Sequence, residues 1–490
     1  MIFNSLTYLL LLFSVVLLYW LLPYRARLLL IFSSSLLFYG FWRIEFVPVM
    51  LISVVVDYLV SIRMPTSTQR IKHKLLLTSL VVNLGLLFYF KYLIFFSETA
   101  IGLANVFGAQ VDPLVMKIIL PLGISFYTFQ TISYTVDVYR GLIKPERDFV
   151  LYGCYVTFFP QLVAGPVLRA IEVIPQFANR VKFSWLDIST GLRRILYGLF
   201  LKVVIADNIA PLVDDGFLMP VDTMSALDVW TLAFLFGFQI YFDFSAYSHI
   251  ALGSARLMGI CFPENFNFPY IATSPKDFWG RWHISLSSWI RDYLYLPLAG
   301  IKVHDRSIGG LANATLAGGS SSTKKKYRSL FMTWAIMGLW HGANWTFVLW
   351  GIYHSIVIVI YRIVAPVTRG FHDRLKVIGG MVVTLPIMML AWVPFRAENL
   401  NDAVQMWLKV FDPSAYGVLG MRENAYLAAA FVMASIFLTY WVKNKLILIV
   451  MGMRRGDILV VAGEVLVFSI MIPLVIIFLR PINQFIYFQF

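Results

Sequence analysis

Charged residues make up only 13% of the 490 positions and hydrophobic residues make up 59%, a composition that excludes a water-soluble globular fold. The formal net charge of +14 could indicate a nucleic-acid-binding protein. The Lys and Arg residues, however, occur in short clusters between apolar runs, which is the pattern of cytoplasmic loops in membrane proteins. We therefore expect an all-α integral membrane protein that crosses the bilayer many times and has no nucleic-acid partner.

Apolar runs occur from one end of the chain to the other. A transmembrane helix needs roughly 20 mainly apolar residues, and several runs approach that length. The main runs cover residues 6–22, 28–41, 46–62, 75–96, 331–339, 377–393, 425–442 and 458–479. Together with weaker apolar segments, they predict roughly eleven transmembrane helices.

The distribution of basic residues predicts the orientation of these helices. Arg25 and Arg27 follow the first run and a basic cluster at 63–74 follows the third, whereas residues 97–113 contain no Lys or Arg. Because Lys and Arg are enriched on the cytoplasmic side, we expect the N-terminus outside and the basic loops inside. The long basic loop 302–328, rich in Gly and Ser, is expected to be cytoplasmic and mobile.

Residues 151–167 are apolar but are interrupted by Pro160, Gly165 and Pro166. Basic stretches that we expect to be cytoplasmic lie on both sides, so this segment predicts a re-entrant or interfacial element rather than a crossing. Irregular backbone at membrane depth requires protein or water around it, so the segment is expected to line an interior space. The sequence has no internal repeat, and we expect one domain over residues 1–490 with its catalytic region at about residues 239–350.

His341 is the first candidate for chemistry, because polar side chains are costly in the bilayer and therefore indicate function there. At 1.5 Å per residue from Arg328, His341 lies about 20 Å along a helix, and residues 342–344 predict a break in that helix. A neutral imidazole can accept a proton from an alcohol and pass it to a leaving thiolate, as acyl transfer from a thioester requires. The alternative is a core histidine hydrogen-bonded to a neighbouring carbonyl.

A second histidine, His283, lies in the aromatic stretch 277–292, in which Asp277 and Arg281 have the spacing of an ion pair on a helix. We expect this stretch to form an amphipathic helix at the inner face, where it could meet a soluble donor. The sequence alone leaves open whether His283 acts chemically or orients the structure.

Gln239, Asp243 and Tyr247 recur at four-residue spacing, which places them on one face of a helix. We expect this face to point into the protein as a hydrogen-bonding set, with a structural role ahead of direct catalysis. The sequence contains no GxSxG, P-loop, HExxH or CxxC motif, so no bound metal is expected.

Six segments together carry a resemblance to a known family. They are PLGISFYTFQTISYTVDVYRG (121–141), FFPQLVAGPVLR (158–169), YFDFSAYSHI (241–250), DFWGRWHISLSSWIRD (277–292), LWHGANWTF (339–347) and FIYFQF (485–490). With these segments the chain resembles the membrane-bound O-acyltransferase family, and within it the bacterial alginate O-acetyltransferase branch.

The resemblance implies a polytopic helical fold around a central funnel. It also implies that His341, in the WHGA motif, is a catalytic histidine and that His283 is a second important one. Trp340 and Asn344 flank the WHGA histidine and are expected to support it, as is the set that contains Asp243.

The resemblance further implies that acetyl-CoA is the donor substrate, that it arrives from the cytoplasm, and that no cofactor is permanently bound. We expect four residues of the segment 276–291 to bind this donor: Lys276, Arg281, Trp282 and Arg291. Basic side chains in such a position would attract a polyanionic carrier.

The expected location is the bacterial inner membrane, with a periplasmic acceptor that is either an exopolysaccharide or an acetyltransferase partner protein. The sequence departs from the alginate branch at Ala246, His249 and Gly280, so cellulose, another exopolysaccharide and peptidoglycan remain open beside alginate. Three other functions compete: D-alanyl transfer to teichoic acid, a transporter or channel, and a non-catalytic scaffold that assembles with a polymer synthase.

Overall fold

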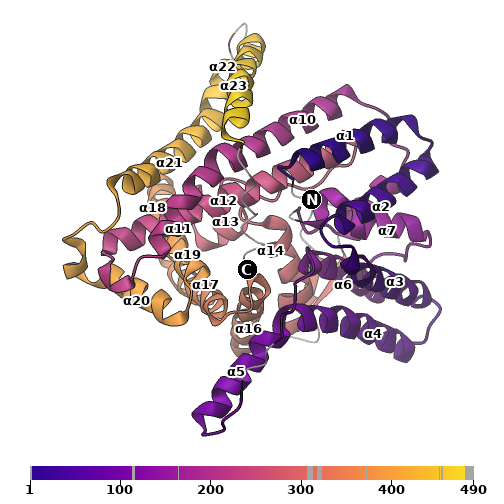
Figure 1. Cartoon of the computed structure of the whole chain (residues 1–490), viewed down its shortest axis with the longest axis horizontal. Coiled ribbons are helices and arrows are strands. Elements are labelled where there is room, and N and C mark those ends of the chain that lie inside the picture. The colour runs from indigo at the N-terminus through magenta and orange to yellow at the C-terminus, as the bar shows by residue number, and fades with distance from the viewer. Residues whose placement is uncertain are drawn as a thin grey trace. The chain divides into compact units, whose positions relative to one another are not determined.

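The computed structural model describes residues 3–112, 116–163, 165–305, 313–316, 323–370, 372–451, 453 and 456–479. The chain divides into two compact units. Figure 1 labels most of their helices. Unit 1 comprises Met1–Arg194, Ala251–Pro263 and Ser288–Ser329, and unit 2 comprises Ile195–Ile250, Glu264–Ser287 and Leu330–Phe490. The prediction of one domain over the whole chain stays a prediction.

Unit 1 is built mainly from the N-terminal helices. Its α-helices are α1 (Leu6–Leu21), α2 (Tyr24–Gly40), α3 (Val47–Arg63), α4 (Gln69–Leu87), α5 (Leu93–Val106), α6 (Ile124–Arg140), α7 (Phe149–Thr157), α8 (Phe159–Leu162), α9 (Ala170–Ala178) and α15 (Leu296–Leu298). The strands β1 (Ile301–Asp305) and β2 (Asn313–Leu316) pair antiparallel.

Unit 2 contains the C-terminal helices. They are α11 (Asp207–Phe217), α13 (Pro275–Trp279), α17 (Trp345–Val364), α18 (Asp373–Leu390), α19 (Trp392–Arg396), α20 (Leu400–Phe411), α21 (Glu423–Trp441), α22 (Ile447–Met451) and α23 (Gly456–Phe478). The boundary between the units falls inside α10 (Trp185–Leu199), α12 (Ala226–Leu257), α14 (Ile284–Ile290) and α16 (Thr323–His341).

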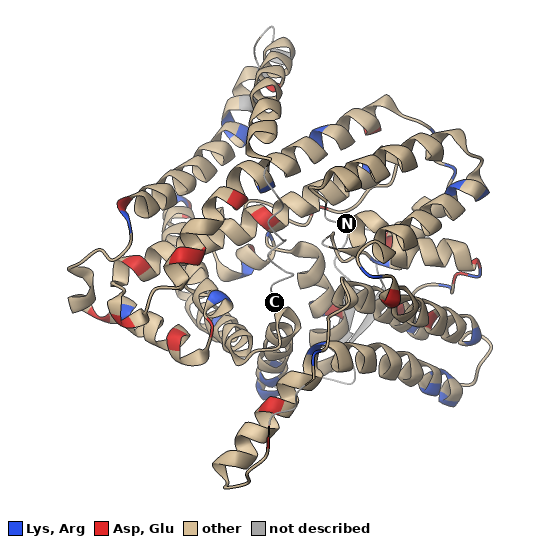
Figure 2. Ribbon diagram, viewed as in Figure 1, with Lys and Arg blue, Asp and Glu red and all other residues tan. Residues whose placement is uncertain are grey.

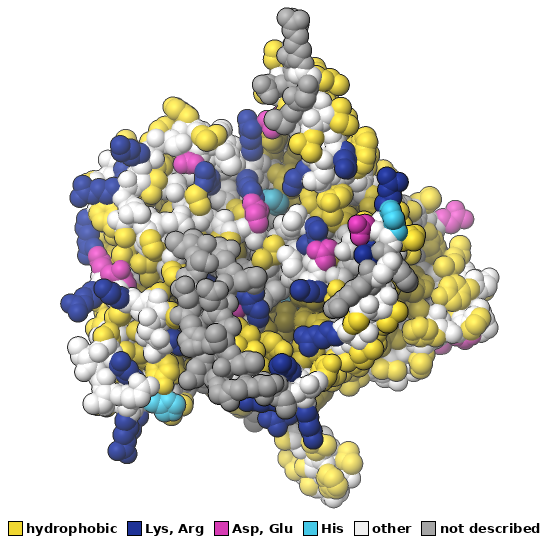
Figure 3. All heavy atoms as spheres, turned by 180° about the vertical axis from the view of Figure 1, so that it is seen from behind, with side chains coloured by type: hydrophobic (Ala, Val, Ile, Leu, Met, Phe, Trp, Pro, Cys, Tyr) yellow, Lys and Arg dark blue, Asp and Glu magenta, His cyan; other side chains and the backbone are white. Residues whose placement is uncertain are grey.

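The prediction of an all-α multi-pass membrane protein is confirmed. Among the described residues, eight helical segments are long and apolar enough to cross a membrane, and two shorter apolar helices accompany them. The exposed side chains of α5 and α23 are mainly hydrophobic (Figure 3), and charged residues are few along the helices (Figure 2). The number of eleven crossings, the central funnel and the inside or outside position of each loop stay predictions.

The core of unit 1 forms around α6, whose residues are almost all buried. A buried carboxylate on α3, Asp57, accepts hydrogen bonds from Asn83 Nδ2 at 2.6 Å and from Thr135 Oγ1 at 3.0 Å. Such bonds offset part of the cost of placing a carboxylate in an apolar surrounding. They join α3, α4 and α6 through polar groups within the membrane-spanning part of the chain.

The interruption expected in 151–167 is confirmed. Helix α7 ends at Thr157, Phe158 leaves helical geometry, and Pro160 lies in the first turn of the short helix α8. Proline suits that position because its missing N–H would have no helical partner there. Residues 151–163 are all buried, as expected of irregular backbone away from lipid.

Two expectations about local structure were wrong. Residues 302–328 were expected to form one long loop, yet part of it pairs as β1 and β2. Helix α16 already begins at Thr323 and includes the basic residues 324–328. Residues 306–312 and 317–322, and the closing FIYFQF, lie outside the described residues. The stretch 277–292 is not one amphipathic helix, because the chain breaks between α13 and α14 at His283.

Candidate active site

His341 is the last residue of α16, at the break that the sequence predicted. After residues 342–343, Asn344 caps α17 through its Oδ1, which accepts a hydrogen bond from the N–H of Thr346 at 3.0 Å. Asn344 adopts extended backbone geometry, as N-cap residues do. His341 itself is only 4% exposed and Gly342 is buried, as expected, whereas the turn becomes half-buried at Ala343 and Asn344.

Glycines let α16 and α17 approach closely on both sides of this turn. A Cβ atom at Gly338 would lie 2.1 Å from the carbonyl oxygen of Phe347, and a Cβ at Gly351 would lie 2.1 Å from the carbonyl oxygen of Trp334. Neither position can accept a larger residue without a backbone shift. The two glycines therefore fix the packing that holds His341 in place.

Aromatic rings surround His341. Its ring centroid lies 4.9 Å from that of Trp340, 4.9 Å from that of Trp350 and 5.1 Å from that of Phe395 on α19. Such surroundings exclude water and strengthen any hydrogen bond made to the imidazole.

His283 has an unusual backbone conformation, with φ of 41° in the left-handed region. A non-glycine residue in that region costs roughly 1 to 2 kcal/mol, so neighbouring contacts must hold it there. Asn265 supplies several of these contacts. Its carbonyl oxygen accepts a hydrogen bond from the N–H of Ile284 at 2.9 Å, and its Oδ1 accepts from Ser285 Oγ at 2.8 Å.

The same Oδ1 of Asn265 lies 3.1 Å from Nδ1 of His283. Because Asn265 Nδ2 donates to Ser248 Oγ at 3.3 Å, Oδ1 is the acceptor and Nδ1 of His283 carries the proton. Nε2 of His283 then presents a lone pair, and it has no hydrogen-bond partner among the described residues. Burial lowers the pKa of His283 to about 3, so the imidazole is neutral near pH 7.

The structure brings the two candidate histidines close to the same tryptophan. The centroid of the Trp340 ring lies 4.9 Å from that of His341 and 6.4 Å from that of His283. Trp340 is itself buried. The two motifs RWHISLS and LWHGANWTF therefore meet within unit 2.

The set on α12 is part of a buried ion-pair network. Lys202 Nζ lies 2.8 Å from Oδ1 of Asp243 and 2.8 Å from Oδ1 of Asp207, and it lies 5.9 Å from the ring centroid of Tyr247. Asp243, Tyr247 and Lys202 are all buried. Gln239 lies one turn earlier on α12 and is half-buried. A structural role of this set is consistent with these contacts.

The four expected donor-binding residues occupy different environments. Lys276 is exposed on α13, and Arg281 Nε donates to Asp277 Oδ1 at 2.8 Å, which confirms the expected ion pair. Trp282 is 1% exposed and packs on Trp392 with a centroid distance of 4.8 Å.

Arg291 belongs to unit 1, where its Nε donates to Asp292 Oδ1 at 2.7 Å. The buried Asp292 also pairs with Arg169 at 2.8 Å. The donor-binding role of all four residues stays a prediction.

Three residues of the site escaped sequence analysis: Asn265, Lys202 and His354. No sequence pattern marks Asn265, because it lies in an irregular segment. Lys202 lies within an apolar run and is the partner of Asp243 that the sequence could not identify. His354 on α17 did carry a signal, since it is an ionisable residue within an apolar run.

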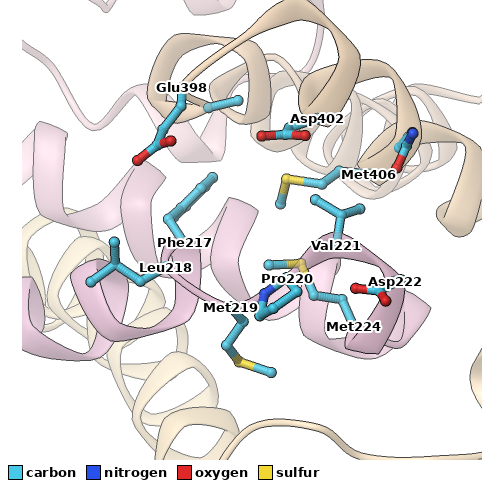
Figure 4. A pocket seen from close by; sticks show the side chains of 12 residues that line it. Phe217, Leu218, Met219, Pro220, Val221, Asp222, Met224, Glu398, Asp402 and Met406 are labelled. Carbon is cyan, nitrogen blue, oxygen red and sulfur yellow. The ribbon is translucent and has the colours of Figure 1, made fainter.

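A cavity of about 510 Å³ lies within unit 2 (Figure 4). Its lining comes mainly from the segment after α11, with Asp222, from the segment that joins α19 to α20, with Glu398, and from α20, with Asp402. The side-chain amide of Asn344 donates to the carbonyl oxygen of Glu398 at 3.4 Å. The N-cap of α17 therefore contacts one lining residue of the cavity, through the backbone of that residue.

This arrangement has the parts that acyl transfer needs. A buried histidine at a helix break can accept a proton in a water-poor surrounding, and the neutral His283 can accept a hydrogen bond through Nε2. With its low pKa, His283 is a poor proton acceptor near pH 7, because an effective general base has a pKa near the working pH. His341, at the end of α16, is the candidate base that the sequence indicated.

Comparisons with known proteins extend these observations. A family model described as the membrane-bound O-acyltransferase family matches residues 28–310, which include His283 but end before His341. A protein of Azotobacter vinelandii named "Probable alginate O-acetylase AlgI" is 39% identical over 84% of this chain and 78% of its own length.

Two further relatives carry different names. A "Peptidoglycan O-acetyltransferase" of Helicobacter pylori is 35% identical over 76% of this chain and 71% of its own length. A "Teichoic acid D-alanyltransferase" of Bacillus subtilis is 30% identical over 57% of this chain and 69% of its own length. All three names describe transfer of an acyl group.

Proposed function

Since this chain belongs to the membrane-bound O-acyltransferase family, we propose that it moves acetyl from cytoplasmic acetyl-CoA to a periplasmic acceptor for O-acetylation of an exopolysaccharide. The polymer is alginate or a polymer like it, and the membrane is the bacterial inner membrane. The observation that carries this proposal is the buried His341 at the break between α16 and α17, where aromatic rings surround it.

In this reaction the acceptor hydroxyl oxygen forms a bond to the acetyl carbonyl carbon, and the bond from that carbon to the thioester sulfur breaks. His341 takes the hydroxyl proton and returns it to the leaving thiolate, so the histidine is unchanged after each cycle. The aromatic surroundings exclude water, which would otherwise hydrolyse the thioester. His283, whose ring lies 6.4 Å from that of Trp340, can accept a hydrogen bond from a bound substrate through the lone pair on its Nε2.

The sides of the membrane follow from charge. Residues 207–222, which form α11 and the segment after it rather than one loop, carry several Asp and no Lys or Arg, as expected near the outside surface. The cavity that includes Asp222 therefore opens on the acceptor side. The basic end of α17, at Arg362, lies on the opposite side, from which a polyanionic donor would approach Lys276 and its neighbours.

The carboxylates of the cavity bear on the acceptor. Asp222, Glu398 and Asp402 line it, and like charges disfavour the approach of a polyuronate such as alginate. We therefore favour transfer first to a hydroxyl of a periplasmic partner protein, which forwards the acetyl group to the polymer. Direct transfer to an uncharged polysaccharide is the second route that this lining permits.

The test compares acetyl transfer by the His341→Ala variant with transfer by the wild-type protein. Acetyl transfer is measured as the acetyl content of the exported polymer. The amount of each protein in the membrane and its thermal stability are measured in parallel. Loss of a positioned general base costs 10² to 10⁴-fold, so acetylation should fall to background while the folded amount stays the same. Normal acetylation in well-expressed His341→Ala cells would refute the catalytic role and favour a scaffold.

The purified protein in liposomes separates the remaining alternatives. Release of free CoA from acetyl-CoA is expected, with no transfer from a D-alanyl carrier protein. The opposite preference would assign the chain to D-alanyl transfer, as in the Bacillus subtilis relative. Uptake of a solute without cleavage of any thioester would indicate a transporter.

A further inference from the structure

A cluster of four aromatic rings lies next to His341 and has no role in the reaction as described so far. Its members are Trp279 on α13, Trp334 on α16, and Trp350 and His354 on α17. Every pair of these rings is in contact, with centroid distances from 4.7 to 6.0 Å. Trp350 also contacts His341 at 4.9 Å, so the cluster and the candidate base share one neighbour.

The cluster buries polar atoms that have no hydrogen-bond partner among the described residues. These atoms are Nε1 of Trp279, Nε1 of Trp350, and both Nδ1 and Nε2 of His354. His354 and Trp350 are each only 1% exposed. Leaving a buried donor or acceptor without a partner is unfavourable, so several such atoms in one place indicate that something else binds to them.

The chemistry of these atoms describes what binds. A neutral His354 has one donor and one acceptor nitrogen, and each indole adds a donor, so donors predominate. The complementary group is rich in carbonyl oxygen and carries a single N–H, which is the description of an amide. No member of the cluster is a Lys or Arg, which makes a phosphate or carboxylate a poor match.

The position of the cluster indicates which substrate carries the amide. Along α17, His354 lies between the helix break at Asn344 and the basic end at Arg362, the side from which the donor comes. Trp279 is half-buried and follows the exposed Lys276 on α13, so the cluster extends toward the surface on that side. The arm that joins the nucleotide of coenzyme A to its sulfur contains amides.

We propose that Trp279, Trp350 and His354 form a subsite that binds an amide of the thioester arm of the acyl donor and so places the thioester next to His341. This inference rests on the proposed function. It assigns His354 to donor binding and leaves the proton transfer to His341. The hydrogen bonds form only with donors that contain an amide, which makes the subsite measurable.

The experiment compares two small thioesters with the purified protein. S-acetyl-N-acetylcysteamine contains an amide and S-ethyl thioacetate does not, and kcat/KM for thiol release is measured for both. In His354→Phe, the preference for the amide-containing donor should fall by about three- to tenfold, since each neutral hydrogen bond contributes roughly 0.5 to 1.5 kcal/mol. The change should appear mainly in KM.

Matched variants separate donor binding from packing. His354→Gln or His354→Asn restores a hydrogen-bonding group and should recover part of the preference, whereas Trp279→Phe should reduce it through loss of one N–H. His249→Phe makes the same exchange at a histidine that packs on Tyr197 at 4.8 Å, and it should leave the preference unchanged. If His354→Phe does not fold, Trp279→Phe carries the test.

The outcomes distinguish this inference from the proposed function. If the wild-type protein reacts with neither thioester nor acetyl-CoA, the proposed function fails. If it reacts with both small thioesters and the variants lower both rates equally, the subsite is refuted while acyl transfer stands. A selective loss with the amide-containing donor supports the subsite.

Discussion

Burial of His283 predicts that the folded protein loses stability at acid pH, and that replacing this histidine with a residue that does not titrate removes that part of the pH dependence. Its pKa in the folded protein is about 3 because burial disfavours the charged imidazolium, whereas the ordinary value is 6.5. Below the ordinary value, the unfolded chain binds a proton that the folded chain does not. The contribution of the neutral His283 to the free energy of unfolding is therefore complete above about pH 6.5, and it decreases as the pH falls toward the pKa of about 3 in the folded protein.

The magnitude follows from the two pKa values. Each pH unit below 6.5 costs about 1.4 kcal/mol, so the contribution of His283 falls by roughly 2 kcal/mol between about pH 7.5 and pH 5.0. That loss is a substantial part of the stability of an ordinary domain. Because His283 lies outside the eight candidate membrane spans, the protonation need not occur within one of them.

The assay is thermal unfolding of the detergent-solubilised protein over this pH range, with His283→Asn as the matched variant. An asparagine keeps a side-chain N–H that can donate to Asn265 Oδ1, but it does not titrate. The wild-type protein should lose stability more steeply toward pH 5.0 than the variant does. Parallel curves for the two proteins would refute the account of His283 as a buried neutral imidazole.

Three further predictions concern neighbouring residues. Asn265→Asp places a carboxylate beside Nδ1 of His283 and favours its imidazolium, so acyl transfer should fall at acid pH where the wild-type protein is still active, as a pH profile of thiol release would show. Gly351→Ala should lower the free energy of unfolding by about 1 to 3 kcal/mol, because the new Cβ would clash with the carbonyl oxygen of Trp334. A variant as stable as the wild-type protein in a thermal unfolding assay would contradict the close packing. Lys202→Met should destabilise the protein by about 3 to 5 kcal/mol, and adding Asp243→Asn should recover part of that loss in the same unfolding assay; no recovery would mean that the pair is not coupled.

The sequence predicted the general architecture because composition and run length decide it. Apolar runs such as 425–442 and 458–479 became α21 and α23 almost without change. The break at His341 was also predictable, since it depends on nearby residues: Asn344 is a strong N-cap. Features set by local sequence were therefore accessible.

Features that depend on distant residues were not accessible. The break between α13 and α14 at His283 is held by Asn265, which lies in an irregular segment with no periodicity to mark it. A helical pattern was therefore the simplest interpretation of 277–292, although the backbone there has a positive φ. Likewise, the β1–β2 pairing within a Gly- and Ser-rich loop has no strong alternation of polar and apolar residues to predict it.

Lys202 and His354 show that the rule for intramembrane ionisable residues should be applied to every such residue, including those outside recognised motifs. Each lies in an apolar run, where a charged or polar side chain is costly unless it has a partner or a function. Lys202 has partners, since it lies between Asp207 and Asp243. His354 has no hydrogen-bond partner among the described residues and lies beside Trp350, which contacts His341. The same rule thus separates a structural ion pair from a residue for which a role in donor binding is the better explanation.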